Sequence, residues 1–299
     1  MRPLLVTPGD PSGIGPEVAV EALRALELPA ILVGDAAAVE RWAGPLPRVT
    51  SVGPVDGLCV LEAPGEGPIE LRSVELAAKA CLAGDGRALV TGPIHKGRLA
   101  ARGHPISGHT ELLGAICGAE PVMAFVGGEL RVALVTTHLP LMQVGAALSA
   151  RRIQHTVRVA ERALREQLGL ATPRVTVCGL NPHAGDDGLL GVEELTLIKP
   201  ALEPLRGAGL DVRGPVSAEA AFLAARQGRT DLVVAMYHDQ GLAPLKVVDF
   251  GRSVNWTLGL PIVRTSVDHG TAFDLAGKGV ADPASMVAAL ELALRLTRA

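Results

Sequence analysis

Residues 231–246, DLVVAMYHDQGLAPLK, join a short apolar run to a group of polar side chains. Residues 231–236 are rich in valine and have no helical period, which predicts a short buried strand. In an open α/β sheet, ligands bind outside the carboxyl ends of the strands. The pattern therefore places His238, Asp239 and Lys246 where a ligand is expected.

Two other stretches have the same order of apolar strand, short polar step and histidine: VALVTTH, ending at His138, and VTVCGLNPH, ending at His183. Right-handed crossovers in a parallel sheet would bring all three strand ends to one edge. Three imidazoles suit a divalent metal such as zinc, cobalt or nickel and leave coordination positions open for a substrate. Each histidine alone is better explained as a hydrogen-bonding residue at a strand end, but the repetition favours a metal site.

Further polar residues accompany these strand ends. Lys246, and Arg264 at the end of another apolar segment, suit a phosphate or a carboxylate, although either is also explained as a surface charge. Asp239 is suited to orient the imidazole of His238 or to be a surface acid. Asn255 is suited to a polar substrate or to a turn.

Two glycine-containing loops precede helical patterns. Residues 7–17, TPGDPSGIGPE, indicate a strand, a loop and a helix, and the glycines serve either an anion site or a tight turn. The loop lacks the third glycine of the dinucleotide fingerprint. Residues 107–111, SGHTE, place His109 and Thr110 at a helix start, where anions bind readily.

The alternation of short strands and helices predicts an α/β protein with a parallel sheet. At 299 residues the chain suits two domains. Because no linker interrupts it, we expect the backbone to cross between the domains more than once, with the last helix returning to the first domain.

The composition excludes several classes of function. A net charge of -3 and only 2% aromatic residues do not suit nucleic-acid binding. The four cysteines form no CxxC pair, which predicts reduced core thiols. The chain has neither an apolar run long enough to cross a membrane nor a signal segment, so a cytoplasmic protein is expected.

Eight motifs together resemble the 4-hydroxythreonine-4-phosphate dehydrogenase family. In chain order they are GDPSGIGPE, TGPIHKG, GHTELL, TTHLPL, GLNPHAG, MYHDQGL, VNWTLGLP and RTSVDHGTAFDLAGKG. The last also resembles the adenosine-binding loop of isocitrate and isopropylmalate dehydrogenases. The resemblance implies their fold, with two α/β/α domains and a cleft between them. Residues 1–125 and 265–299 would form the first domain with the nucleotide loop, and residues 126–264 the second, with the metal and dimer contacts.

The resemblance also implies a set of site residues. It makes His138, His183 and His238 ligands of a divalent metal (Zn, Co, Mg, Mn or Ni). The implied substrate contacts are His109, Thr110, Lys246, Asn255 and Arg264. The implied contacts of NAD or NADP are His269, Gly270, Thr271, Asp274, Gly277 and Lys278. A homodimer is implied as well, with the active site at its interface and metal ligands from both subunits.

The implied reaction is oxidation of 4-phosphohydroxy-L-threonine to 2-amino-3-oxo-4-phosphooxybutanoate, which decarboxylates to 3-amino-2-oxopropyl phosphate in pyridoxine 5'-phosphate biosynthesis. We expect the metal to stabilise the alkoxide and the enolate. We expect Arg264, Lys246 and His109 to hold phosphate and carboxylate, and Asp239 or Lys246 to move protons. The identity of the general base stays open.

Two departures from the family pattern concern specificity. Asp186 stands where the family has glutamate, and Glu219 and Ala220 stand where it has aspartate and threonine. A related dehydrogenase of 4-phospho-D-threonate or 4-phospho-D-erythronate is therefore an alternative. More distant alternatives are a three-histidine metal phosphohydrolase, disfavoured by the HGTAFDLAGKG loop, and a ligand-binding protein without catalysis.

Overall fold

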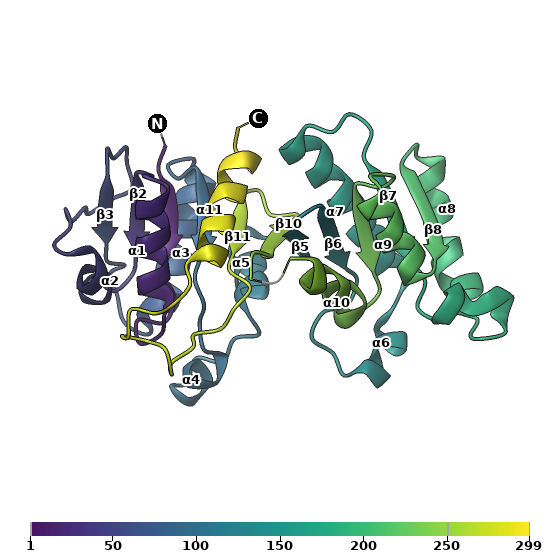
Figure 1. The fold of residues 1–299 in the computed structure, drawn as a ribbon, viewed down its shortest axis with the longest axis horizontal. Helices are drawn as coiled ribbons and strands as arrows, with labels where there is room; N and C mark the ends of the chain where they lie inside the picture. Colours follow the sequence, from purple (N-terminus) through teal and green to yellow (C-terminus); the bar gives the residue numbers. More distant parts are fainter. Residues whose placement is uncertain (1, 250, 299) are drawn as a thin grey trace. The chain divides into compact units, whose positions relative to one another are not determined.

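The computed structural model describes residues 2–249 and 251–298, which divide into two compact units (Figure 1). The first unit comprises residues up to 121 together with residues 254–298, and the second comprises residues 122–253. From the sequence, the backbone was expected to return from the second unit to the first at residues 264–265. The return lies earlier because strand β10 (Val254–Leu258) pairs antiparallel with β11 (Arg264–Ser266), which keeps β10 in the first unit.

The first unit is built on a sheet with the strand order β3-β2-β1-β4-β11-β10. Apart from the β10–β11 pair, the strands of this sheet pair in parallel. Their continuous apolar runs fit strands that are covered on both faces. The remaining strands are β1 (Leu4–Thr7), β2 (Ala30–Val33), β3 (Leu58–Leu61) and β4 (Ala88–Thr91).

Helices cover this sheet and follow ordinary start signals. Helix α1 begins beside Pro16, as expected from the fixed φ of proline, and the side chain of Asp35 caps α2 by accepting from Ala38 N at 2.8 Å. Helices α1 and α11 pack against each other, while Val74 of α3 and Leu113 of α5 pack in a core with Leu5 of β1. The helices are α1 (Gly15–Ala25), α2 (Ala36–Ala43), α3 (Ile69–Ala83), α4 (Lys96–Ala101), α5 (His109–Cys117) and α11 (Ala284–Leu296).

The second unit has the strand order β5-β6-β9-β7-β8. Strands β6, β9, β7 and β8 pair in parallel, whereas β5 and β6 are antiparallel. The sequence-based expectation of a parallel sheet therefore holds only in part. The short turn after Gly127 is the reason, because a parallel connection needs a crossover of a dozen or more residues. The strands are β5 (Val122–Gly127), β6 (Leu130–Leu134), β7 (Arg174–Cys178), β8 (Asp211–Val216) and β9 (Leu232–Ala235).

Helices α9 (Ala218–Arg226) and α10 (His238–Val248) pack through Phe222 and Leu245 against a core that includes Phe125 and Val132. Helix α7 (Ala150–Leu168) is capped by the side chain of Ser149, and it also contacts the sheet. The other helices are α6 (Leu141–Ala147), a short turn of 3₁₀ type (Pro182–Gly188), a π-helical turn (Glu194–Ile198) and α8 (Lys199–Gly207).

None of the helices in the described part of the chain combines the length and the apolar composition needed to cross a bilayer. The four cysteines are unpaired, in agreement with the expected thiols. Burial raises the pKa of Cys81 and Cys178 to about 12, so these thiols are protonated near neutral pH.

Candidate functional site

In the second unit, His138 and His238 lie side by side. Their rings are 5.4 Å apart between centroids, with 41° between the ring planes. The histidines follow β6 and β9, which are neighbouring parallel strands, so the topology brings these two strand ends to one edge of the sheet. Two of the three histidines singled out in the sequence are thus adjacent in space.

Hydrogen bonds join the ends of the three strands that precede these histidines. The hydroxyl of Thr136, after β6, donates to Met236 O at 2.7 Å. Gln240 accepts from Met236 N at 2.7 Å and donates to Gly179 O, after β7, at 2.7 Å. This role of Gln240 was not predicted from the sequence, although the residue lies within the motif MYHDQGL. The three polar strand ends therefore form one connected edge.

His183 lies on an unusual turn after β7. Residues 183–187 all have positive φ, between 44° and 84°, and only one of them is glycine. A left-handed conformation costs roughly 1–2 kcal/mol for each non-glycine residue, so surrounding contacts must hold this turn. His183 itself is exposed.

Within residues 2–249 and 251–298, no group of three or more His, Cys, Asp and Glu side chains is placed to hold a metal ion. The chain brings together His138 and His238 and puts His183 on the adjacent strand end. The donor chemistry suits a divalent transition metal, because imidazole is a common ligand for zinc, cobalt and nickel. The three-histidine ligand set stays a prediction.

Helix α10 carries further predicted residues. Asp239 Oδ1 lies 2.7 Å from His238 Nδ1, as expected for a carboxylate that orients an imidazole. This contact leaves Nε2 of His238 as the nitrogen available to a ligand. Lys246 is half-buried in the last turn of the same helix.

In the first unit, Arg264 is a buried charge, with 1% of its surface exposed. Its guanidinium donates to Thr91 Oγ1 from Nη2 at 2.6 Å and to Thr257 Oγ1 from Nη1 at 2.7 Å. Burial lowers the pKa of Arg264 to about 9, while Glu111 acts in the opposite direction. Both hydroxyl partners are neutral, so the site favours an added anion.

His109 is the first residue of α5. Its Nε2 is buried and has no hydrogen-bond partner within the described residues. Burial, followed by the charges of Arg264 and Lys96, lowers the pKa of His109 well below its ordinary value, so the imidazole is neutral near pH 7. Asn255 Oδ1 is also buried without a partner in this part of the chain. Such orphaned polar atoms need a ligand or water.

Thr110 does not cap helix α5. Thr110 is buried as the second residue of α5, whereas Gly108 occupies the cap position and no side-chain capping bond forms there. Capping of α5 therefore accounts for neither Ser107 nor Thr110. Thr110 stays a predicted substrate contact.

The predicted nucleotide loop is held against the glycine loop near the N-terminus. Ile14 N donates to Thr271 O at 3.0 Å, and Ala281 N donates to the buried carboxylate of Glu17 at 3.0 Å. A Cβ on Gly13 would lie 2.8 Å from Thr271 O. Gly13 thus permits close packing of the two loops, which supports the tight-turn explanation for this glycine.

The same loop also has features that suit a ligand. His269 Nδ1 lies 2.9 Å from Gly270 O, while its Nε2 is buried and unpartnered within the described residues. The ring of Phe273 lies 5.4 Å from that of His95 and 4.6 Å below the guanidinium carbon of Arg98. Gly277 has φ +79°, a conformation that favours glycine, and Asp274 and Lys278 are exposed.

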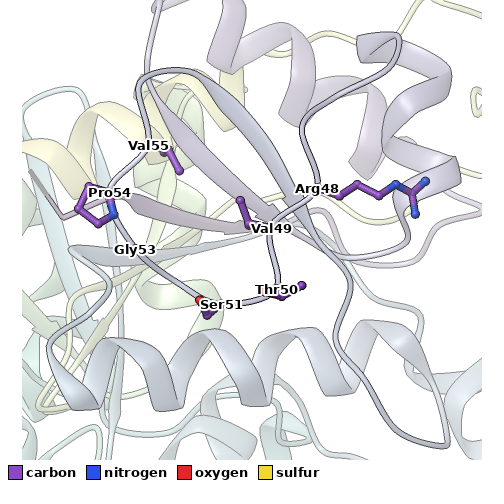
Figure 2. Close-up of a pocket in the computed structure, with 7 residues that line it drawn as sticks. All are labelled: Arg48, Val49, Thr50, Ser51, Gly53, Pro54 and Val55. Carbon is purple, nitrogen blue, oxygen red and sulfur yellow. The ribbon is translucent and has the colours of Figure 1, made fainter.

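A separate pocket of about 340 Å³ lies in the loop after α2 and contains none of the predicted site residues. It is lined by Arg48, Val49, Thr50, Ser51, Gly53, Pro54 and Val55 (Figure 2). The guanidinium of Arg48 points away from Val49 and Val55 and pairs with Glu40 at 2.9 Å. The one charged side chain among these lining residues is thus already paired, and we assign the pocket no function.

Comparison with known proteins points to one family. The family model described as "Pyridoxal phosphate biosynthetic protein PdxA" matches residues 55–293. A 4-hydroxythreonine-4-phosphate dehydrogenase of Stenotrophomonas maltophilia is 44% identical, over 100% of this chain and 98% of that protein.

Solved structures show the same relationship. The 4-hydroxythreonine-4-phosphate dehydrogenase of Klebsiella pneumoniae matches with a TM-score of 0.89 and 36% identity over 100% of both chains. A terephthalate 1,2-cis-dihydrodiol dehydrogenase of Burkholderia xenovorans matches with a TM-score of 0.71 and 30% identity over 98% of both chains. The fold is accordingly the isocitrate dehydrogenase-like α/β fold that was expected. The chain belongs to the PdxA family of pyridoxal phosphate biosynthetic proteins.

Proposed function

We propose that this chain oxidises 4-phosphohydroxy-L-threonine with NAD or NADP and a divalent metal. The product, 2-amino-3-oxo-4-phosphooxybutanoate, decarboxylates to 3-amino-2-oxopropyl phosphate. The observation that carries this proposal is the buried group of Arg264 and His109, which combines a cation with an unpartnered polar atom. Such a group suits an anionic substrate, and relatives that align over the full chain are named for a phosphorylated hydroxy amino acid.

In this proposal the first unit binds the acidic groups of the substrate. Arg264 provides a planar donor array that Thr91 and Thr257 hold in place, which suits a phosphate or a carboxylate. His109, Thr110 and Asn255 provide further polar contacts. Lys246 is a further candidate contact, and Asp239 and Lys246 are the candidate proton carriers.

His138, His183 and His238 would hold the metal in this proposal, with Asp239 orienting His238. A divalent metal supplies a Lewis acid for the developing alkoxide and enolate. The neighbouring imidazoles of His138 and His238 support this assignment. The metal is one of Zn, Co, Mg, Mn or Ni.

The nicotinamide cofactor would bind the loop at residues 269–278, through His269, Gly270, Thr271, Asp274, Gly277 and Lys278. The unpartnered Nε2 of His269 and the fixed conformation of this loop support the assignment. The sequence of this loop does not contain the glycine-rich Rossmann fingerprint, so its contacts with the cofactor would differ from those of the Rossmann fold.

We also propose a homodimer. Large apolar side chains are exposed next to each of the three histidine segments, which is typical of a surface that binds another protein. These are Leu139, Leu141 and Met142 after His138, Leu189, Leu190, Val192 and Leu195 after His183, and Val247 and Val248 at the end of α10. A second copy of the chain would cover them and complete the metal site.

The test is a spectrophotometric assay of the purified protein with either nicotinamide cofactor and a divalent metal. We expect 4-phosphohydroxy-L-threonine to give reduced nicotinamide and an amino ketone product, and His183→Ala to lose bound metal by elemental analysis. No reduction with any substrate, together with release of inorganic phosphate, would instead favour a metal phosphohydrolase.

A second candidate is a dehydrogenase of 4-phospho-D-threonate or 4-phospho-D-erythronate. The dihydrodiol dehydrogenase relative shows that this fold occurs in proteins named for other substrates. Asp186 and Glu219, which depart from the family pattern, are both exposed. Running the assay with the three phosphorylated substrates in parallel separates the candidates by kcat/KM.

A further inference from the structure

The buried carboxylate of Glu194 organises the segment between β7 and α8. Glu194 is 2% exposed and begins the π-helical turn. Its Oε1 accepts from Leu180 N at 2.7 Å and from Asn181 N at 2.8 Å, and its Oε2 accepts from Asn181 Nδ2 at 2.9 Å. One carboxylate thus satisfies three donors immediately before His183.

The left-handed turn of residues 183–187 packs directly on this carboxylate. A Cβ on Gly185 would lie 2.7 Å from Glu194 Oε2, and one on Gly179 would lie 2.9 Å from Glu194 Oε1. Ala184 N donates to Asn181 O at 3.1 Å, which ties the turn to the same residue that Glu194 holds. Glu194 therefore contacts the turn at its start and at its centre.

We infer that Glu194 is a positioning residue for His183, and this inference rests on the proposed metal-binding function. Residues with positive φ return to ordinary backbone conformations when their surroundings no longer hold them. His183 lies at the first position of the turn, so its imidazole moves with any such relaxation. A carboxylate forms stronger hydrogen bonds to backbone N–H groups than a neutral acceptor does.

The neighbouring residue Glu193 provides a matched control. Glu193 Oε2 accepts from Asn181 Nδ2 at 2.7 Å, but unlike Glu194 it accepts from neither Leu180 N nor Asn181 N. Glu193→Gln therefore alters a carboxylate of the same type on the same segment and leaves the carboxylate under the turn in place.

The substitution Glu194→Gln tests the inference with little change in size. The amide keeps one oxygen for the two backbone donors, but its NH₂ group faces the Asn181 amide, which is itself a donor. Asn181→Ala is a second variant that removes the side-chain bonds to Glu194 and Glu193 and leaves both backbone bonds to Glu194 in place. It is the fallback if Glu194→Gln does not fold.

The readout is the Kd for Co²⁺, measured by calorimetric titration of the chelator-stripped full-length protein, with thermal unfolding of the metal-free protein in parallel. We expect Glu194→Gln to weaken Co²⁺ binding about 10- to 100-fold, the range found for residues that orient metal ligands. Glu193→Gln should bind as the unsubstituted protein does. Amide hydrogen exchange of residues 183–187 should speed up in metal-free Glu194→Gln, a change that the Glu193 control should lack.

The outcomes separate this inference from the proposed function. Unchanged Co²⁺ affinity in Glu194→Gln, while His183→Ala abolishes binding, would overturn the role of Glu194 and leave the metal site in place. Equal weakening in the Glu193 control would also overturn it. No Co²⁺ binding by the unsubstituted protein would overturn the metal site and the inference together.

Discussion

Arg264 is a buried guanidinium whose two described side-chain partners, Thr91 and Thr257, are neutral hydroxyls. Burial of a charge is unfavourable unless hydrogen bonds and an opposite charge compensate for it. Glu111 provides some compensation, since it raises the pKa of Arg264 while burial lowers it. A bound anion would provide the rest, and the hydroxyls would keep the guanidinium fixed meanwhile.

Replacing Arg264 with lysine tests whether substrate binding depends on the planar donor geometry of the guanidinium or only on its positive charge. Arg264→Lys keeps a cation but loses the planar donors that reach both threonines. We expect KM for the phosphorylated substrate to rise about 10- to 100-fold, because the variant loses one to two charged hydrogen bonds to the substrate. The change in kcat should be smaller. Steady-state kinetics check this. Arg206→Lys, which changes an arginine that donates to Val212 O in the second unit, should leave KM unchanged.

His109 should make stability depend on pH in a defined direction. Its pKa is 6.5 in the unfolded chain and lower in the folded protein, so below about pH 6.5 the unfolded state binds the additional proton. Stability due to this group is therefore present above that pH and is lost on acidification, by up to about 1.4 kcal/mol per pH unit.

The measurement compares thermal unfolding of the unsubstituted protein and of His109→Gln between pH 8 and pH 5. The unsubstituted protein should lose more stability than the variant as the pH falls. Parallel curves would show that His109 titrates normally and is not desolvated.

The sequence predicted His109 at a helix start and Arg264 at the end of an apolar segment, where β11 in fact begins, but it did not predict that either side chain is buried. The reason is that burial depends on neighbours distant in sequence: Thr91 and Thr257 belong to other strands, and neither attracted attention as a site residue. Glu194 was missed likewise, because a glutamate in a helical pattern is normally a surface residue.

Helix α10 depends on a close approach to the sheet at Gly241. A Cβ on Gly241 would lie 2.7 Å from Val132 Cγ1 and 2.9 Å from Leu134 Cδ2, both on β6. The glycine lets the helix that begins at His238 pack near the strand that precedes His138. The spacing of the two imidazoles therefore depends on this contact.

Gly241→Ala should push α10 away from β6. We expect a loss of about 1–3 kcal/mol in the free energy of unfolding, as for other overpacked cores, and weaker Co²⁺ binding. Urea unfolding and calorimetric titration measure the two effects. Gly145→Ala is the control, because Gly145 is an exposed residue of α6 with open space around it, and alanine there should stabilise the protein by about 0.5–1 kcal/mol.

At the scale of helices and strands, the sequence was informative about the strands and less so about the segments that come after them. Continuous apolar runs located β6, β7 and β9, and parallel pairing then joined their ends. The helical start at His238 was not expected, because Gly241 and Pro244 within the segment lower its helix propensity. The left-handed turn at His183 was not predictable either, since aspartate and histidine adopt positive φ as single residues and not in a run, so tertiary contacts must impose it.

For the whole molecule, the exposed apolar residues predict a dimer that a single charge should disrupt. Met142 is 93% exposed, so Met142→Asp should not disturb the folded chain but would bury a charge in an interface. We expect sedimentation velocity to show a monomer and the dehydrogenase activity to fall to a small fraction. Leu82→Asp, on α3 of the first unit, should remain dimeric; dimers of both variants would contradict the proposed interface.

The second unit is one continuous segment, while the first is assembled from two segments that flank it. The first unit receives β10, β11 and α11 only from residues 254–298. During synthesis, all strands of the second unit therefore emerge from the ribosome before the first unit has its full sheet. The sheet that carries His138, His183 and His238 can therefore be completed first during synthesis, and the buried site around Arg264 forms only when the last segment arrives.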